Sequence, residues 1–285
     1  MKIMNKKWLF TLAFVLILVG IVGMAMNKFK FYEDLVSYEK RWDLQASQDI
    51  KLLEIRSNLN LNITFESSLD DTGYINLEGN IKPEHAEILN AFQPIDANIR
   101  MDFSDANTFE FLGFDFRMPK ANMTIVLPQH TSLQELDMVA LTGNIQLNDA
   151  TADDMNLLVA AGNIELNRIQ ANRLVVKNVA GKITGNNIQA EAEMNTVAGD
   201  IVLKDMEGPL DIQVTTGSVQ ADLTGVHKVN ILCRAGNVKV APDASFRGYY
   251  NLKALAGTVK APKAMEETND MIQVETYSGN ITIVH

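Results

Sequence analysis

The sequence predicts an all-β protein whose second half is a β-solenoid, a stack of about eight short coils. Glycines recur in that half at gaps of 18 to 22 residues, and a regular spacing of this kind is typical of stacked repeats. Around each glycine, apolar residues alternate with polar ones, which indicates strands rather than helices. The glycines are Gly143, Gly162, Gly181, Gly199, Gly217, Gly236, Gly257 and Gly279.

The first 26 residues predict a membrane anchor. Residues 1–7 are expected to be a cytoplasmic tail, and residues 8–26 are uncharged, almost wholly apolar and flanked by lysines on both sides. Nineteen such residues in a helix nearly span a bilayer core. We therefore expect a single-pass protein of the cytoplasmic membrane with its C-terminal domain outside. The alternative is a cleaved signal peptide, with Gly23 and Ala25 before the cut.

Residues 27–47 are predicted to be a stalk or linker, and residues 48–130 a β-rich N-terminal cap. The segment 27–42 mixes aromatic residues with both charges, which we interpret as a helical stalk. We interpret the phenylalanines between Phe103 and Phe116 as the core of the cap, the alternative being an exposed binding patch. The cap is expected to contain a short helix at 83–92, and strands at 50–55, 59–65, 74–78, 99–103, 109–116 and 123–127.

Residues 131–285 are predicted to form the solenoid repeats. The residues seven and five positions before each glycine are almost always apolar, and the residue two positions after it is always isoleucine or valine. Inward-facing residues therefore lie at odd offsets before the glycine and at an even offset after it. A strand cannot make this change without a bend, so we expect a corner at the glycine. The residue after the glycine is usually polar and suited to hydrogen bonding along the stack. One coil buries too little to fold alone, so only an array is stable.

The charge is unevenly distributed. Residues 1–42 carry 7 basic and 3 acidic side chains, whereas the rest of the chain carries 18 basic and 32 acidic ones, which together give the net charge of −10. An acidic body repels nucleic acid and favours a cationic partner. On coils four and five, Glu191, Glu193 and Asp211 are expected to face outward, with Glu193 and Asp211 stacked about 4.8 Å apart.

This acidic face has two interpretations. It is a solvated surface, or it binds a divalent ion or a cationic partner that relieves the repulsion between its carboxylates. Glu135, Asp137 and Asp154 are expected to form a similar group on coils one and two.

The segment TIVLPQHTSLQELDMVALTGNIQL at 124–147 is followed by repeats of glycine, a polar residue and isoleucine or valine, behind an N-terminal anchor. In this, the chain resembles a bacterial family of extracytoplasmic putative adhesins of unknown function, especially its membrane-anchored LiaG-like members. The resemblance covers residues 48–285. It implies a single-stranded, right-handed parallel β-helix and, for LiaG-like members, a link to cell-envelope stress. It carries no catalytic motif and no active-site residues.

The sequence contains no phosphate-binding loop, zinc-ligand spacing, nucleophile elbow or calcium-binding repeat. We predict no catalytic residue, cofactor or firm metal ligand, and a non-enzymatic interaction, scaffold or adhesion protein of the cell envelope. The alternative is a polysaccharide-modifying enzyme on a β-helix. Aromatic platforms for sugar rings are missing between Arg117 and Ser245, which disfavours it.

The last strand, expected at 277–284, has almost no sequence after it that could cover its edge. We therefore predict that it forms an open end of the rod. Open strand edges pair readily with other strands, so this end is expected to support end-to-end self-association or to bind a strand of an envelope protein.

Overall fold

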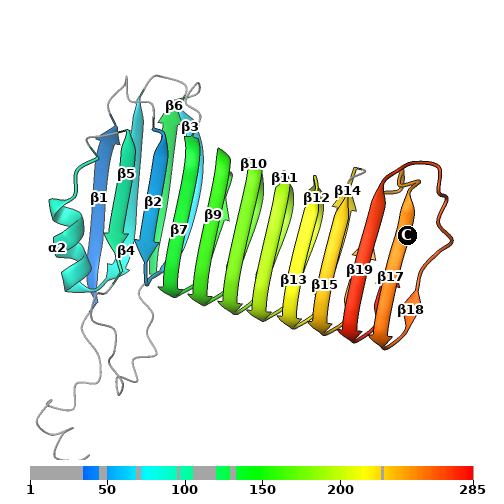
Figure 1. The fold of residues 1–285 in the computed structure, drawn as a ribbon. Helices are drawn as coiled ribbons and strands as arrows, with labels where there is room; N and C mark the ends of the chain where they lie inside the picture. The colour runs from blue at the N-terminus through cyan, green and yellow to red at the C-terminus, as the bar shows by residue number, and fades with distance from the viewer. Residues whose placement is uncertain are drawn as a thin grey trace, which may run out of the picture.

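The computed structural model describes residues 35–44, 50–68, 72–94, 97–104, 120–128, 133–225 and 228–284. They form an elongated all-β rod in which strands stand side by side along its length (Figure 1). The predicted cytoplasmic tail and transmembrane anchor, the first part of the stalk and the strand expected at 109–116 lie outside these residues. Within them, no helix is both long enough and apolar enough to cross a membrane.

Strands β7 to β20 form the coils that carry the glycines. Neighbouring coils pair in parallel, and residues at the same offset from the glycine lie opposite each other: Met155 pairs with Leu136 on one side and Leu174 on the other. The predicted register is confirmed. The strands are β7 (Leu133–Thr142), β8 (Ile145–Asn148), β9 (Thr151–Ala161), β10 (Ile164–Ala180), β11 (Ile183–Ala198), β12 (Ile201–Glu207), β13 (Leu210–Thr216), β14 (Val219–Thr224), β15 (Val229–Ala235), β16 (Val238–Ala241), β17 (Tyr249–Ala256), β18 (Val259–Lys260), β19 (Met271–Ser278) and β20 (Ile281–Ile283).

The glycines lie at corners, as predicted, and the eight of them have positive φ angles. Gly199, for example, has a φ of 157°. A Cβ atom at this position would clash with the backbone carbonyl of Gly181 in the preceding coil. Glycine is therefore required for two reasons, the bend and the close approach of stacked backbones.

The residues that follow the glycines form a hydrogen-bonded ladder. The backbone N–H of Lys182 donates to Asn163 Oδ1 at 2.9 Å, and the N–H of Asn163 donates to Asn144 Oδ1 at 2.7 Å. The same bond recurs between Ser218 and Asp200. A lysine side chain has no acceptor, so Lys182 cannot continue the ladder toward the next coil. This predicted stacking of corner residues is confirmed.

The solenoid begins earlier than residue 131. Strands β2 (Leu52–Ser57) and β3 (Asn60–Ser68) pair in parallel with β7 and β8, and β5 (Asn98–Phe103) and β6 (Lys120–Pro128) pair in parallel with the other edges of β2 and β3. Leu59 takes the place of the glycine, and Asn60 Oδ1 accepts from the N–H of Asn144 at 2.8 Å. The predicted cap region therefore contains two further coils.

A separate cap does cover the N-terminal end of the rod. Strand β4 (Gly73–Ile81) pairs antiparallel with β6, and β1 (Val36–Leu44) pairs antiparallel with β4. Helix α2 (Pro83–Ala91) packs against β1 and β5 (Figure 1). Between them, these elements cover the outer edges of β5 and β6.

The helical stalk predicted over residues 27–42 is wrong where β1 begins. Tyr38, Trp42 and Leu44 are buried while their neighbours face outward, so the segment has strand periodicity. The Trp42 indole N–H donates to the carbonyl of Phe92 at 3.1 Å, and the two rings pack edge to face. Lys40 Nζ donates to the carbonyl of Leu89 at 3.0 Å near the end of α2. Within β1, Trp42 and Lys40 thus serve packing against the end of α2.

The coils at the C-terminal end do not stack in sequence order. Strand β15 pairs with β19, and β17 pairs with the opposite edge of β19; β20 lies likewise between β16 and β18. The prediction that the last strand forms the open end is therefore wrong, because β17 and β18 occupy that position. The segment 261–270 returns the chain to the inner coil, and the N–H of Tyr249 donates to the carbonyl of Asp270 at 2.8 Å. An equivalent inversion places β5 and β6 outside β2 and β3.

Candidate functional site

A regular surface runs along the outward side of the sheet formed by β2, β7, β9, β10, β11, β13, β15, β19 and β17, which we call the broad face (Figure 1). Its residues lie eight, six, four and two positions before each corner glycine. Alternation along a strand turns these even offsets outward, while the offsets seven, five and three positions before the glycine form the core. Stacking then aligns each offset into a column that runs along the rod.

The acidic residues predicted on coils four and five lie on the broad face. Glu193 is directly opposite Asp211 in the parallel register, as expected. Both have polar partners: Asn195 Nδ2 donates to Glu193 Oε1 at 2.8 Å, and Asn230 Nδ2 donates to Asp211 Oδ2 at 2.7 Å. Amide groups therefore offset part of the repulsion between these two carboxylates.

A basic residue also lies within this acidic group. Arg173 is opposite Glu191 in the register, and its guanidinium is 3.9 Å from Glu193 Oε2. In the part of the chain that the structure describes, no three histidine, cysteine, aspartate or glutamate side chains gather closely enough to hold a metal ion. Glu193 and Asp211 thus each have an amide partner, and Arg173 lies beside Glu191 and Glu193.

In the second acidic group, Glu135, Asp137 and Asp154, the carboxylates repel one another. Glu135 lies beside Asp154 in the register and close to Asp137, and the charge of Asp137 is the main cause that raises the pKa of Glu135. Partial burial and the charges of Asp154 and Glu54 act in the same direction. Glu54 itself is paired with Arg56 at 2.7 Å and Arg100 at 3.0 Å.

Replacing Glu135 with glutamine should stabilise the fold at neutral pH. Because the folded protein binds the Glu135 proton more tightly than the unfolded chain, stability falls as pH rises from the ordinary glutamate pKa through the raised one. Removing the charge cancels this loss. The gain should be below about 1 kcal/mol, since solvent screens exposed charges, and should disappear below the ordinary pKa. Unfolding curves against pH measure it, with the exposed Glu66→Gln as the control, and superimposable curves for Glu135→Gln and the native chain would contradict it.

An exposed aliphatic row runs along the opposite border of the broad face, next to the glycine corners. Leu141, Val179 and Val197, each two residues before its glycine, are 53%, 49% and 51% exposed. Ala160, which is half-buried, has the same position in the coil between Leu141 and Val179, and Leu158, two residues before it, is exposed. We call Leu141, Leu158, Ala160, Val179 and Val197 the aliphatic row.

This row was not among the predicted features. Its signal was present, because the offset two positions before the glycine is apolar in successive coils although strand alternation turns it outward. The small residues that precede the glycines, such as Ala161, Ala180 and Ala198, are exposed beside the row and extend its apolar surface.

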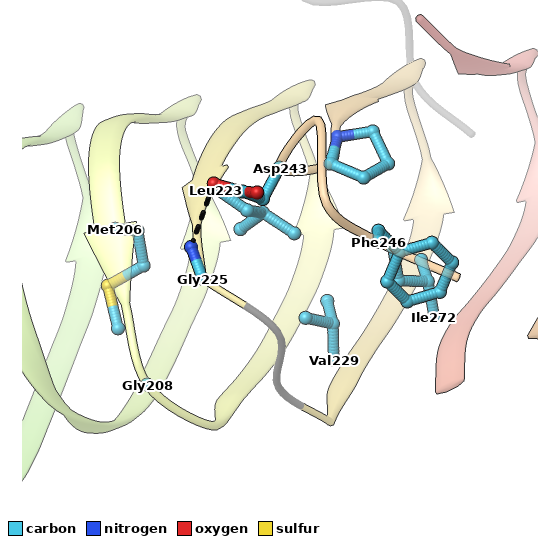
Figure 2. A pocket seen from close by; sticks show the side chains of 9 residues that line it. Met206, Gly208, Leu223, Gly225, Val229, Asp243, Phe246 and Ile272 are labelled. Atoms are coloured by element: carbon cyan, nitrogen blue, oxygen red, sulfur yellow. Dashed lines mark hydrogen bonds between the residues drawn. The ribbon is translucent and has the colours of Figure 1, made fainter. Parts of the chain in front are cut away.

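A small hollow lies where the chain leaves the regular coil after β14 and β16 (Figure 2). Met206, Leu223, Phe246 and Ile272 line it, and its interior volume is about 10 Å³. That is room for about one water molecule, so the hollow is a packing irregularity rather than a binding pocket for a sugar or a cofactor.

Asp243 at this hollow is a structural anchor. Its carboxylate accepts from the N–H of Ser245 at 2.7 Å and from the N–H of Gly225 at 3.1 Å, the bond drawn in Figure 2. The hydroxyl of Ser245, followed by these two N–H groups, lowers the pKa of Asp243. A carboxylate held in its ionised form by three donors ties two loops together and is a poor proton donor.

Cys233 is likewise part of the core. It is fully buried, and burial raises the pKa of its thiol. Its Sγ donates to the carbonyl of Gly217 at 3.3 Å, a contact that Thr276 and Asn178 reproduce in other coils with Gly236 and Gly162.

Comparison with known proteins places this chain in a family. The Toastrack DUF4097 family matches residues 50–284, which include the two coils before the first glycine. No curated protein matches the chain.

Three crystal structures are similar to the chain over most of its length, each covering 87% of it. One, described as a putative lipid binding protein from Parabacteroides distasonis, has 14% identity over 97% of its own chain and a TM-score of 0.47. A putative adhesin from Bacteroides fragilis has 14% identity over 97% and a TM-score of 0.38. A putative cell adhesion protein from Clostridium sporogenes has 11% identity over 99% and a TM-score of 0.26. At these scores, none of the three carries an argument about binding.

The family match agrees with the resemblance to extracytoplasmic adhesin-like proteins that the glycine-centred repeats suggested, and it spans both the predicted cap and the predicted solenoid. The chain therefore belongs to the Toastrack DUF4097 family.

Proposed function

We propose that the protein is a non-enzymatic interaction scaffold of the bacterial cell envelope, anchored in the cytoplasmic membrane by residues 8–26, with a right-handed solenoid outside. The observation that carries the proposal is the aliphatic row on the broad face. Exposed apolar patches with polar rims are typical of protein interaction sites. The resemblance to LiaG-like proteins supports a role in envelope stress or adhesion.

The broad face defines the chemistry of the partner. The aliphatic row extends over four coils, which at 4.8 Å per coil is about 14 Å. The acidic groups, which include Glu135 and Glu193, lie across the same strands on the other side of the face. A protein segment with an apolar ridge and basic residues along one flank complements both features, and its charges would fix its orientation on the face.

Membrane topology and binding are tested on the full chain in cells. A reporter enzyme that is active only outside the membrane, fused after His285, should be active and remain in the membrane fraction at full length. A photoreactive residue in place of Val179 should then crosslink to one envelope component, whereas one in place of the exposed Lys204 on β12 should not.

Three outcomes would overturn the proposal. Release of a shortened soluble product would show that residues 8–26 are a signal peptide. Equal crosslinking from Val179 and Lys204 would show that the aliphatic row is not selective. Turnover of peptidoglycan or teichoic acid by the purified chain would establish an enzyme instead.

A further inference from the structure

The C-terminal end of the rod has an open strand edge. In the preceding coils the N–H of each corner glycine donates to the next coil, as Gly236 does to the carbonyl of Ser278 and Gly279 to that of Ala256, both at 2.9 Å. Gly257 holds the equivalent position in the outermost coil, and in the described part of the chain no coil follows it. The N–H of Gly257 therefore points out of the stack.

The core is open at the same place. Ile281 is 0% exposed, whereas Val259, at the same offset in the outermost coil, is 44% exposed. Tyr250, Leu252 and Ala254 face inward on β17 but are only partly buried. The segment 261–270 leaves these residues partly exposed: most of its own residues are exposed, and its backbone bonds run to the residues just before β17, as from Glu267 N–H to the carbonyl of Arg247 at 2.7 Å. It arches past the outermost coil at one margin of the rod (Figure 1).

The two ends of the rod are protected differently. The N-terminal end is covered by β4, β1 and α2 (Figure 1), and the edge strand β1 carries four charged residues, Glu39, Lys40, Arg41 and Asp43. Charges on an edge strand discourage pairing. Strand β17 has one charged residue, Lys253, whose Nζ is neutralised by Glu275 at 2.9 Å. Head-to-tail stacking of copies is therefore blocked at the N-terminal end.

We propose that two copies of this chain associate head to head through their C-terminal coils, with the two β17 strands antiparallel and centred on Leu252. In this register Tyr250 of each copy faces Ala254 of the other, so a large inward side chain meets a small one. On the outward side Asn251 faces Lys253, which keeps the two Lys253 side chains apart.

The directions of the backbone N–H and C=O groups of β17 suit this register. Along the stack the N–H of an inward residue donates forward, as Ala192 does to the carbonyl of Pro209 at 2.9 Å and Leu210 does to that of Lys228 at 3.0 Å. Tyr250, Leu252 and Ala254 are the inward residues of β17, so their N–H and C=O groups face the end of the rod. An antiparallel partner centred on Leu252 pairs all three in hydrogen-bonded positions.

A second copy fits this end better than a single added strand. The partly covered core residues lie on both β17 and β18, on two sides of the coil, and one strand can cover only one side. The open end of another rod presents both edges and the same apolar cross-section, so its core continues that of the first.

Disulfide crosslinking tests the contact and its register. In the proposed dimer Asn251 and Lys253 of opposite copies form a non-hydrogen-bonded pair with Cα atoms about 4.5 Å apart, within the range that a disulfide bridges. The double variant Asn251→Cys with Lys253→Cys, as the purified full chain in detergent micelles, should become mostly covalent dimer under mild oxidation. Both positions are exposed, so the fold should tolerate them, and native Cys233 is buried.

The single variants Asn251→Cys and Lys253→Cys provide the matched controls. In either one, the two introduced cysteines of a dimer would be diagonal neighbours about 7 to 8 Å apart, beyond the reach of a disulfide, so each single variant should yield at most a tenth of the dimer. Absence of dimer from the double variant would overturn the head-to-head contact. If the single variants formed as much covalent dimer as the double variant, the register centred on Leu252 would be overturned.

Discussion

Replacing Gly199 with valine is expected to destabilise the protein by roughly 3 kcal/mol or more. The φ of 157° at this position is one that side-chain-bearing residues rarely adopt, and the added Cβ would clash with the carbonyl of Gly181. The obstacle is backbone in the middle of the stack, so it cannot rotate away as a side chain would. The free-energy cost of the strained backbone and the cost of overpacking therefore add up.

The matched control is Lys204→Val, five residues later on an exposed position of β12. It adds a β-branched residue to the same coil without a steric conflict, so its effect should stay within about 0.5 kcal/mol. Chemical unfolding of both purified variants compares them. Similar losses in the two would show that the corner does not need glycine.

Replacing Val274 with alanine should cost more than replacing Leu252 with alanine, roughly 2 kcal/mol against about 1 kcal/mol or less. Leucine normally loses more than valine on truncation to alanine, so the expected order is the reverse of the usual one. The reason is the inverted stack. Val274 on β19 is fully buried between Ile231 and Leu252, whereas Leu252 lies in the outermost coil.

Equilibrium unfolding of the two variants, measured on dilute monomers so that no second copy covers Leu252, decides between the two stacking orders. If the coils followed sequence order, Leu252 would be internal and Val274 terminal, and Leu252→Ala would cause the larger loss. That result would contradict the inversion.

The sequence was sufficient to predict the fold class and the local geometry of the coils. A corner glycine, the apolar offsets around it and the polar residue after it each depend on contacts between equivalent positions, and equivalence can be read from the spacing. For the same reason the stacking of Glu193 on Asp211 was predictable from their common offset.

What could not be predicted depends on contacts between positions that the repeat does not relate. The coil formed by β2 and β3 lacks the corner glycine, and it is one residue shorter before the corner: Leu53 and Ile55 lie six and four positions before Leu59, whereas their partners Leu136 and Met138 lie seven and five positions before Gly143. The order of the last two coils has no signal in the repeat, because both coils fit the same columns. Strand β1 was misinterpreted because its partners, β4 and α2, lie far along the chain.

The two inversions restrict how such a rod can change in length. A solenoid stacked in sequence order can gain or lose a coil at its terminus and leave a similar end behind. Here, deleting the last coil in the sequence would remove β19 and β20 from the inside of the stack and leave β17 and β18 without a neighbour. The first coil, β2 and β3, is enclosed in the same way by β5 and β6. Insertions and deletions of whole repeats should therefore be tolerated best between β7 and β16, so relatives of different length are expected to differ in the middle of the rod and to share both ends.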